Sequence, residues 1–457
     1  MCIIAAGLSL VAPRAVAEWS ATLPAFAACR PASQPPMPYR WRAVGLMMPF
    51  EQAQLDVGEF VFDGLIPAMR ASVYGLESGA VDLLITNEQT YRLTGPHDAP
   101  TGCTAVGRQF TPPPVQWLTP EAICVGEGKL ANRATQWWKM PGAEKSATWH
   151  WFSTGRRLPW RSMFVSRSPE PAVIGDYAMT YFPVFTPVQE TKLNKLRTFC
   201  EAQSPKLIES AGSQTARALA KPLDDSADEE RVQRIGELIP GLSFSQCSRM
   251  KQVRWPEQLV MTAFITPSAF TEKVNSSLIY YDWKVTKTQL ALMFQGRPLQ
   301  LKGLVSLKAG VGYRVMRTDT GGHCEAVFPG IVRPNWAEVA GCTCRGVIDR
   351  HETISPRYAK QIFNCPIKWQ GNRTMWNWYT TDGQPSMFAE AGAEVGGVVL
   401  ADYQDWLPGQ QVPPKDFELP HACFPSGNIS HGPVSRPAFS DISCTDCHTS
   451  TVPGAPQ

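Results

Sequence analysis

The chain has 457 residues, of which 44% are hydrophobic and 10% aromatic, so it is long enough for two or three domains with sizeable cores. Only 18% of the residues are charged, and the formal net charge is +3. No run of Lys or Arg stands out, which argues against a basic surface for nucleic acid or an anionic membrane.

The N-terminus is typical of an export signal. An apolar stretch over residues 2–13 precedes a small-x-small cleavage pattern at 15–17, so residues 1–17 are predicted to be a signal peptide. The alternative is an ordinary buried N-terminal segment. The stretch is too short to cross a bilayer, and no later run reaches about 18 apolar residues. We therefore expect an exported protein (periplasmic, cell-surface or extracellular) with no transmembrane segment.

Sequence motifs recur in the same order with an offset of about 220 residues, which indicates an internal duplication. The matched motifs are Arg40-Trp41 with Arg254-Trp255, Tyr91-Arg92-Leu93 with Tyr313-Arg314-Val315, Trp149-His150-Trp151 with Trp376-Asn377-Trp378, Met163-Phe164 with Met387-Phe388, and Asp176-Tyr177 with Asp402-Tyr403.

The cysteines follow the same duplication. Of the 13 cysteines, Cys2 lies in the predicted signal, which leaves an even number, typical of a disulfide framework in an oxidising compartment. The disulfide candidates are Cys29, Cys103, Cys124 and Cys200 in the first copy, Cys247, Cys324, Cys342 and Cys423 in the second, and the additional Cys344 and Cys365. Four cysteines allow three connectivities, which the sequence does not separate. The simplest expectation pairs the inner two and the outer two of each set, and Cys344 with Cys365.

Most local patterns predict strands, because β-branched and aromatic residues recur between Gly, Pro, Asp and Asn. Helix-like spacing is confined to residues 189–220 and 225–239. The expected fold is mainly β with some α: two tandem copies of a disulfide-stabilised antiparallel-sheet module and an irregular tail. The expected ranges are 18–203 for the first copy, 204–240 for a helical, charged connection, 241–424 for the second copy and 425–457 for the tail.

Trp, Phe and Met recur at the predicted strand positions of both copies. In strand content, module length and aromatic placement the body resembles tandem LolA-like half-barrels. This resemblance implies exported modules that hold lipid on a concave face, but it identifies no binding residues because no family motif is present. The alternative is that the aromatic residues fill two ordinary cores.

The tail contains Cys444-Thr445-Asp446-Cys447-His448, a C-x-x-C-H pattern. Two thiols at this spacing reach the two vinyl groups on one porphyrin edge, and the adjacent His can ligate iron. The motif resembles the haem-attachment site of c-type cytochromes, which implies one haem c on Cys444 and Cys447 with His448 as proximal ligand. His431 is the candidate sixth ligand and His421 the second choice.

Two other uses of these tail residues remain open. Cys444 and Cys447 could form a local disulfide, which consumes the same two thiols. A zinc site would need a fourth ligand, and no second C-x-x-C or H-x₃-H pair accompanies the motif.

No catalytic constellation is found in the sequence: it has no G-x-S-x-G elbow, no H-E-x-x-H and no P-loop. An enzyme is therefore not expected. The isolated histidines and copy-matched acids are expected to be structural, the acids as acceptors at strand ends or turns; they are His150, His323, His351, Asp63, Asp282, Asp176 and Asp402.

Two functional hypotheses follow. The first is an exported electron-transfer protein, in which a duplicated β scaffold carries one covalent haem and meets a redox partner protein. The alternative is a non-redox secreted binding protein that holds a lipid, another apolar ligand or a protein partner. A surface protein whose tail only forms crosslinks is a third option.

Overall fold

The computed structural model describes residues 26–410 with gaps. The gaps are residues 31–32, 51–53, 76–78, 108–109, 131–132, 142–145, 167–176, 204–226, 250–255, 267–273, 283–287, 295–298, 307–310, 319–320, 330–341, 349–360, 368–372, 381–382 and 393–396. The predicted signal peptide and the predicted haem motif lie outside the described residues.

The first half of the chain forms one antiparallel sheet of 11 strands, called sheet A here. Its strands are β1 (Arg40–Pro49), β2 (Asp56–Asp63), β3 (Ala68–Gly75), β4 (Gly79–Thr86), β5 (Thr90–Thr94), β6 (Gly102–Gly107), β7 (Ile123–Leu130), β8 (Arg133–Pro141), β9 (Ser146–Ser153), β10 (Pro159–Ser166) and β11 (Tyr177–Pro187). The order in space is β6-β5-β4-β3-β2-β1-β11-β10-β9-β8-β7, so the last strand pairs with the first.

The second half forms sheet B, with 12 strands. They are β12 (Leu242–Ser243), β13 (Gln258–Thr266), β14 (Asn275–Asp282), β15 (Thr288–Phe294), β16 (Leu299–Ser306), β17 (Val311–Thr318), β18 (Gly321–Pro329), β19 (Thr343–Ile348), β20 (Gln361–Ile367), β21 (Arg373–Tyr379), β22 (Pro385–Gly392) and β23 (Gly397–Pro408). Apart from β12, which pairs with β19 at one edge, the order β19-β20-β21-β22-β23-β13-β14-β15-β16-β17-β18 repeats that of sheet A strand for strand. The predicted fold class is confirmed: the protein is mainly β and consists of two copies of one antiparallel module.

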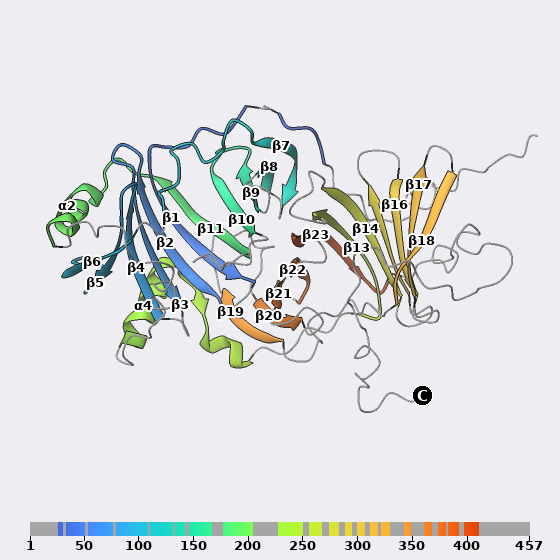
Figure 1. Ribbon diagram of the computed structural model, residues 1–457. Coiled ribbons are helices and arrows are strands. Elements are labelled where there is room, and N and C mark those ends of the chain that lie inside the picture. Colours follow the sequence, from blue (N-terminus) through green and yellow to red (C-terminus); the bar gives the residue numbers. More distant parts are fainter. Residues whose placement is uncertain are drawn as a thin grey trace, which may run out of the picture.

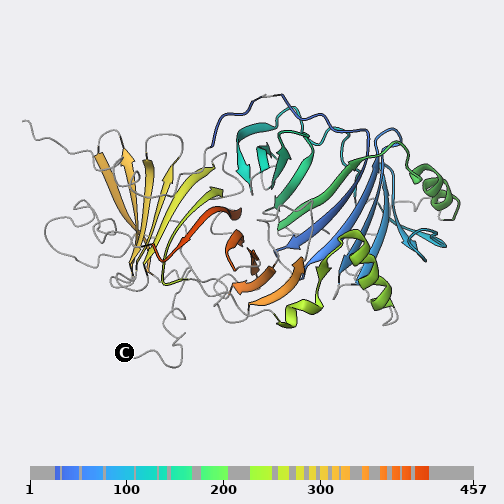
Figure 2. The same ribbon diagram turned by 180° about the vertical axis from the view of Figure 1, so that it is seen from behind.

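The two sheets lie side by side, and β18 lies at the opposite end of the molecule from the helix α2 (Figure 1; Figure 2 shows the view from behind). The face of each sheet that meets the other sheet is called the inner face here. Val44, Leu46 and Met48 of β1 are fully buried on the inner face of sheet A. On its outer face Trp41 and Ala43 pack in a second core. Both faces of the central strands are therefore apolar, as expected for a sheet covered on two sides.

Two helices pack on the inner face of sheet A. α2 (Leu193–Gln203) buries Leu193 and Cys200 against β5 and β6. α4 (Ala227–Leu238) buries Ile235 and Leu238 in the core between the sheets. Both helices fall within the predicted helical ranges, and residues 204–226 between them lie outside the described part of the chain. Neither helix, at 11 and 12 residues, is long enough to cross a membrane, and no other described helix is either.

The predicted disulfide connectivity is wrong, because the cysteines of the first copy alternate. Cys29 bonds to Cys124 and Cys103 bonds to Cys200, so the first cysteine pairs with the third and the second with the fourth. The physical reason lies at the edge strands: the segment that precedes β1 crosses the edge β7, while α2 lies beside β6, at the opposite edge. Each disulfide thus closes one edge of the sheet.

In the second copy Cys247 bonds to Cys344, and Cys342 bonds to Cys365. Both bonds contradict the expected pairing of Cys344 with Cys365. Since Cys344 sits two residues before Gly346 at a bulge, just as Cys124 precedes Gly126, Cys344 and not Cys342 is the counterpart of Cys124. The bond from Cys342 to Cys365 is therefore an addition in the second copy.

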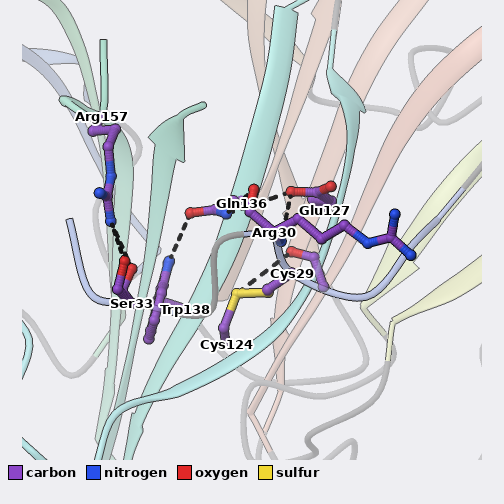
Figure 3. The surroundings of a disulfide bond; sticks show 9 residues. Cys29, Arg30, Ser33, Cys124, Glu127, Gln136, Trp138 and Arg157 are labelled. Atoms are coloured by element: carbon purple, nitrogen blue, oxygen red, sulfur yellow. Dashed lines mark hydrogen bonds between the residues drawn. A yellow bond between two sulfur atoms is a disulfide. The ribbon is translucent and has the colours of Figure 1, made fainter. Parts of the chain in front are cut away.

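The N-terminal segment crosses the free edge of β7 (Figure 3). Ala27 exchanges two backbone hydrogen bonds with Glu127, each 2.8 Å, two residues before the disulfide of Cys29. The ring of Phe26 lies where a Cβ on Gly126 would stand, at 2.3 Å. Only glycine at 126 therefore leaves room for Phe26 to enter the core between the sheets.

Candidate functional site

The centre of the inner faces holds a buried ion pair between the two copies. Arg161 of β10 is fully buried, and its Nη1 and Nη2 donate to Oδ1 and Oδ2 of Asp402 in β23 at 2.8 and 2.7 Å. The side chain of Asp402 is only 4% exposed. A bidentate pair of this kind satisfies both charges in a setting where either alone would be costly. Asp402, expected to be a strand-end or turn acceptor, instead joins the two sheets.

Aromatic and sulfur groups surround the ion pair. Arg161 Nη1 also donates to the hydroxyl of Tyr181 at 2.7 Å, and the guanidinium lies 4.1 Å from the ring centre of Trp151. The hydroxyl of Tyr181 donates to Sδ of Met387 at 2.9 Å, and its ring centre is 4.7 Å from that of Trp378. These five side chains therefore form one contact between sheets A and B.

The tryptophans of the matched W-x-W motifs fill this core. Trp149, Trp151, Trp376 and Trp378 are at most 1% exposed. The indole N–H of Trp378 donates to Sδ of Met48, and that of Trp376 donates to the carbonyl of Pro49. The reading of these aromatics as core residues, left open by the sequence, is the one that the packing supports.

A second polar cluster lies on the inner face of sheet A, where α4 crosses β2. Glu59 is 5% exposed and accepts from Arg42 Nε at 2.6 Å and from Arg234 Nη2 of α4 at 2.7 Å. His97 Nε2 lies 3.3 Å from its carboxylate. Burial alone would raise the pKa of Glu59, but the hydrogen bond of His97 and the charges of Arg42 and Arg234 outweigh it and lower that pKa to about 2.

The cluster continues across β3 and β4. Arg70 donates from Nε to Asp82 Oδ1 at 3.0 Å and from Nη2 to the carbonyl of His97 at 2.6 Å. Nδ1 of His97 lies 3.0 Å from the hydroxyl of Tyr74, and Ser72 donates to Asp82 at 2.8 Å. The cluster thus binds α4 and the loop around His97 to the sheet. Sequence reasoning missed it because its members are scattered over four strands, one helix and a loop and form no motif.

Strand register shows what the second copy has in place of this cluster. In sheet A the row across the inner face runs Val44, Glu59, Ser72 and Asp82. The same row in sheet B runs Thr262, Leu278, Leu292 and Lys302. In the neighbouring row Arg42, Val61 and Arg70 correspond to Val260, Tyr280 and Leu290. The charged row of the first copy is therefore mostly apolar in the second.

The residues predicted from sequence fall into three groups. Eight of the ten disulfide candidates are bonded as described above. The side chains of Cys324 and His323 in β18 are not described, and the remaining candidates lie outside the described residues; they are Cys423, Cys444, Cys447, His448, His431, His421, His351 and Asp176. Asp63 and Asp282 accept hydrogen bonds at their strand ends, from Arg40 and Gln258. Within the described ranges no three His, Cys, Asp or Glu side chains are grouped to hold a metal ion.

His150 is buried beneath the outer face. Its Nδ1 lies 2.7 Å from the hydroxyl of Ser162, and the rings of Trp117 and Phe152 pack beside it. Burial lowers the pKa of His150 to about 4, so the imidazole is neutral at pH 7. Its ring is therefore part of the core that packs on the outer face of sheet A.

Comparison with known proteins adds structural neighbours but no family. No family model and no curated protein matches the chain. Solved structures that match include an uncharacterized conserved protein from Thermus thermophilus (13% identity, 36% of this chain and 88% of that chain, TM-score 0.25). Others are the MucA/MucB complex of Pseudomonas aeruginosa (13%, 62% and 86%, 0.21) and a LolA superfamily protein from Nitrosomonas europaea (10%, 38% and 96%, 0.22). A LolA-superfamily protein, the class that the strand pattern resembles, is thus among the matches, although superpositions of this quality transfer no function.

Proposed function

We propose that this protein is an exported, non-enzymatic binding protein that holds an apolar ligand with an anionic head against the inner face of sheet B. Its four described disulfides fit folding in an oxidising compartment. The observation that carries the proposal is the contrast between the inner rows of the two copies.

In the first copy the inner face is occupied by the protein itself. Arg234 of α4 binds Glu59, and α2 packs over Tyr91 and Cys103 at the far end of the same face. The charged cluster is satisfied by these internal partners. This copy therefore has a structural role in the proposal, and the ligand is assigned to the second copy.

In the second copy the corresponding rows carry leucine and tyrosine. Leu278 and Tyr280 of β14 are followed across the register by Leu292 and Leu290 of β15. The only charged residue in these two rows of β13–β16 is Lys302, where the first copy has Asp82. Such rows suit an acyl chain, and a lysine among them suits a carboxylate head group.

Titration of the full mature chain with cis-parinaric acid, a fluorescent fatty acid, tests the proposal. Leu292→Asp introduces a carboxylate into the leucine row, where the acyl chain of the ligand is proposed to bind. It is expected to weaken the binding of cis-parinaric acid by more than about tenfold. Lys302→Ala is expected to weaken the binding of cis-parinaric acid by about tenfold, because the carboxylate loses its cation. The binding of the methyl ester, which has no carboxylate, is expected to stay unchanged. Leu65→Asp, at a residue that is 61% exposed, and Lys129→Ala on β7 are matched controls.

Circular dichroism and non-reducing mass analysis establish that each variant is folded. The proposal fails if the delipidated wild-type chain shows no saturable binding. It also fails if both inner-row variants bind as the wild type does.

A second candidate function is electron transfer by a C-terminal haem c, and it rests on which cysteines the repeat accounts for. The repeat assigns every body cysteine: eight are bonded, and Cys324 and Cys423 match the positions of Cys103 and Cys200. Cys444 and Cys447 are therefore left over. Two thiols and the imidazole of His448 are the donor set that a c-type haem requires, and the haem would supply one-electron chemistry.

Expression with haem-maturation proteins tests this second candidate. Intact mass and a pyridine haemochrome spectrum are compared between wild type and a Cys444→Ser/Cys447→Ser variant. A haem adduct with an α-band that the variant lacks would support it. A colourless chain with these two sulfurs oxidised to each other would exclude it and leave the ligand-binding proposal unaffected.

A further inference from the structure

The contact between the two sheets has the form of an interface between two copies of one surface. Register defines equivalent positions: Trp151 pairs with Arg161 in sheet A, and Trp378 pairs with Met387 in sheet B. Arg161 and Met387 are therefore equivalent. Since Arg161 pairs with Tyr181 and Met387 pairs with Asp402, Tyr181 and Asp402 are equivalent as well.

The contacts across the interface are reciprocal in these terms. Arg161 of the first copy contacts Asp402, the counterpart of Tyr181. Met387, the counterpart of Arg161, contacts Tyr181 itself. Arg161 and Met387 also meet each other, at 3.5 Å from Nη1 to Sδ. This is the pattern of an isologous two-fold interface: a position of one module contacts the counterpart of a second position in the other module, and the reverse contact is also made.

No described covalent bond holds the two copies of one chain together beyond the backbone. Each of the four described disulfides lies within a single copy. The backbone connection between α2 and α4 runs through residues 204–226, which can span up to about 75 Å when extended. The two modules can therefore separate and meet another chain without bond breakage.

We propose that the inner surface of each module fits a second copy of this chain, so that the protein forms an exchanged dimer. In this dimer the first module of one chain docks on the second module of its partner, and the reverse. The contact of Arg161 with Asp402 is kept, but it joins two chains. This inference is independent of the ligand proposed for sheet B.

Charge reversal in two full-length variants tests the exchange. Arg161→Asp alone places two carboxylates together, and Asp402→Arg alone places two guanidinium groups together, so each chain is expected to lose its internal interface. When both are co-expressed with different tags, the reversed charges match between chains, and the native pair forms in the other interface. The expected product is a mixed dimer of about twice the 50.4 kDa chain mass.

Tandem purification through both tags followed by light scattering identifies that dimer. The Arg161→Asp/Asp402→Arg chain, in which the reversed pair matches both within one chain and between two, is the control and is expected to behave as the wild type does, with dimers that increase with concentration. As a second measurement, ¹⁵N-labelled and unlabelled wild-type chains are refolded together with disulfides intact. Native mass spectrometry is then expected to show mixed-mass dimers that increase with concentration.

Mixed dimers in either experiment support the exchange, whichever variant folds poorly alone. If co-expressed variants yield no mixed dimer and refolded wild-type chains remain monomeric at every concentration, the proposal is overturned.

Discussion

The buried pair of Arg161 and Asp402 gives a quantitative prediction for a double-mutant cycle. Arg161→Met introduces the residue of the equivalent position in the second copy and removes a guanidinium that makes two hydrogen bonds to Asp402. The carboxylate, 4% exposed, then remains buried without its charge partner. Breaking a buried pair from one side costs about 3–5 kcal/mol, so this loss is expected in the free energy of unfolding.

The reverse single variant and the double variant complete the cycle. Asp402→Leu removes the carboxylate that pairs with the buried guanidinium of Arg161, and a similar loss of about 3–5 kcal/mol is expected. Arg161→Met/Asp402→Leu removes both charges, and apolar replacement of a buried pair is often neutral. The double variant is therefore expected to be within about 1 kcal/mol of wild type, with a coupling energy well above 3 kcal/mol.

Urea titration followed by tryptophan fluorescence measures each free energy, because Trp151 and Trp378 lie at the interface. Two results would refute the reasoning. Single variants that lose less than about 1 kcal/mol would mean that the pair is solvated. A double variant as unstable as the single variants would mean that altered packing, and not an unpaired charge, causes the loss of stability.

Three further predictions concern other parts of the chain. Cys324 and Cys423 occupy the repeat positions of Cys103 and Cys200, so peptide mapping without reduction should find them joined; Cys324 bonded to any other cysteine would contradict this. Burial lowers the pKa of His150 from 6.5 to about 4, so the unfolded state binds a proton at a higher pH than the folded state does. The free energy of unfolding is therefore expected to be unaffected above pH 6.5 and to fall by up to about 3 kcal/mol as the pH drops to 4. His150→Asn, the residue at the matched position 377, should flatten this part of the pH profile of urea stability, and an unchanged slope would refute the assignment. Arg234→Met should loosen α4 from Glu59 and speed amide hydrogen exchange in 227–238 at least about fivefold, with the exposed Val232→Met as control.

The duplication could be predicted from sequence because the cysteines and W-x-W motifs keep their order in both copies. The disulfide pairing could not, since Cys342 and Cys344 lie two residues apart and spacing alone gives no reason to prefer either. A usable signal was present: Cys124 and Cys344 each precede a glycine by two residues, and that glycine marks a bulge in β7 and in its counterpart β19.

The ion pair at the interface was beyond sequence reasoning for a different reason. Its partners are 241 residues apart, and each comes from a different copy. Matching Met163 with Met387 by sequence also misplaces the strands by two residues, because the register aligns Arg161 with Met387. A two-residue slip keeps every side chain on its face but changes its neighbour, so pattern alone does not reveal the pair.

The pair of Arg161 and Asp402 explains why a first copy docks on a second copy, and why two first copies or two second copies do not dock on each other. Two first copies would place Arg161 opposite Tyr181, leaving two buried guanidinium groups without a carboxylate. Two second copies would place Asp402 opposite Met387, leaving two buried carboxylates without a cation. Either combination carries an uncompensated charge, whereas the pairing of unlike copies satisfies both. A duplicated surface that can in principle bind itself is thereby restricted to unlike pairs, within one chain or between two.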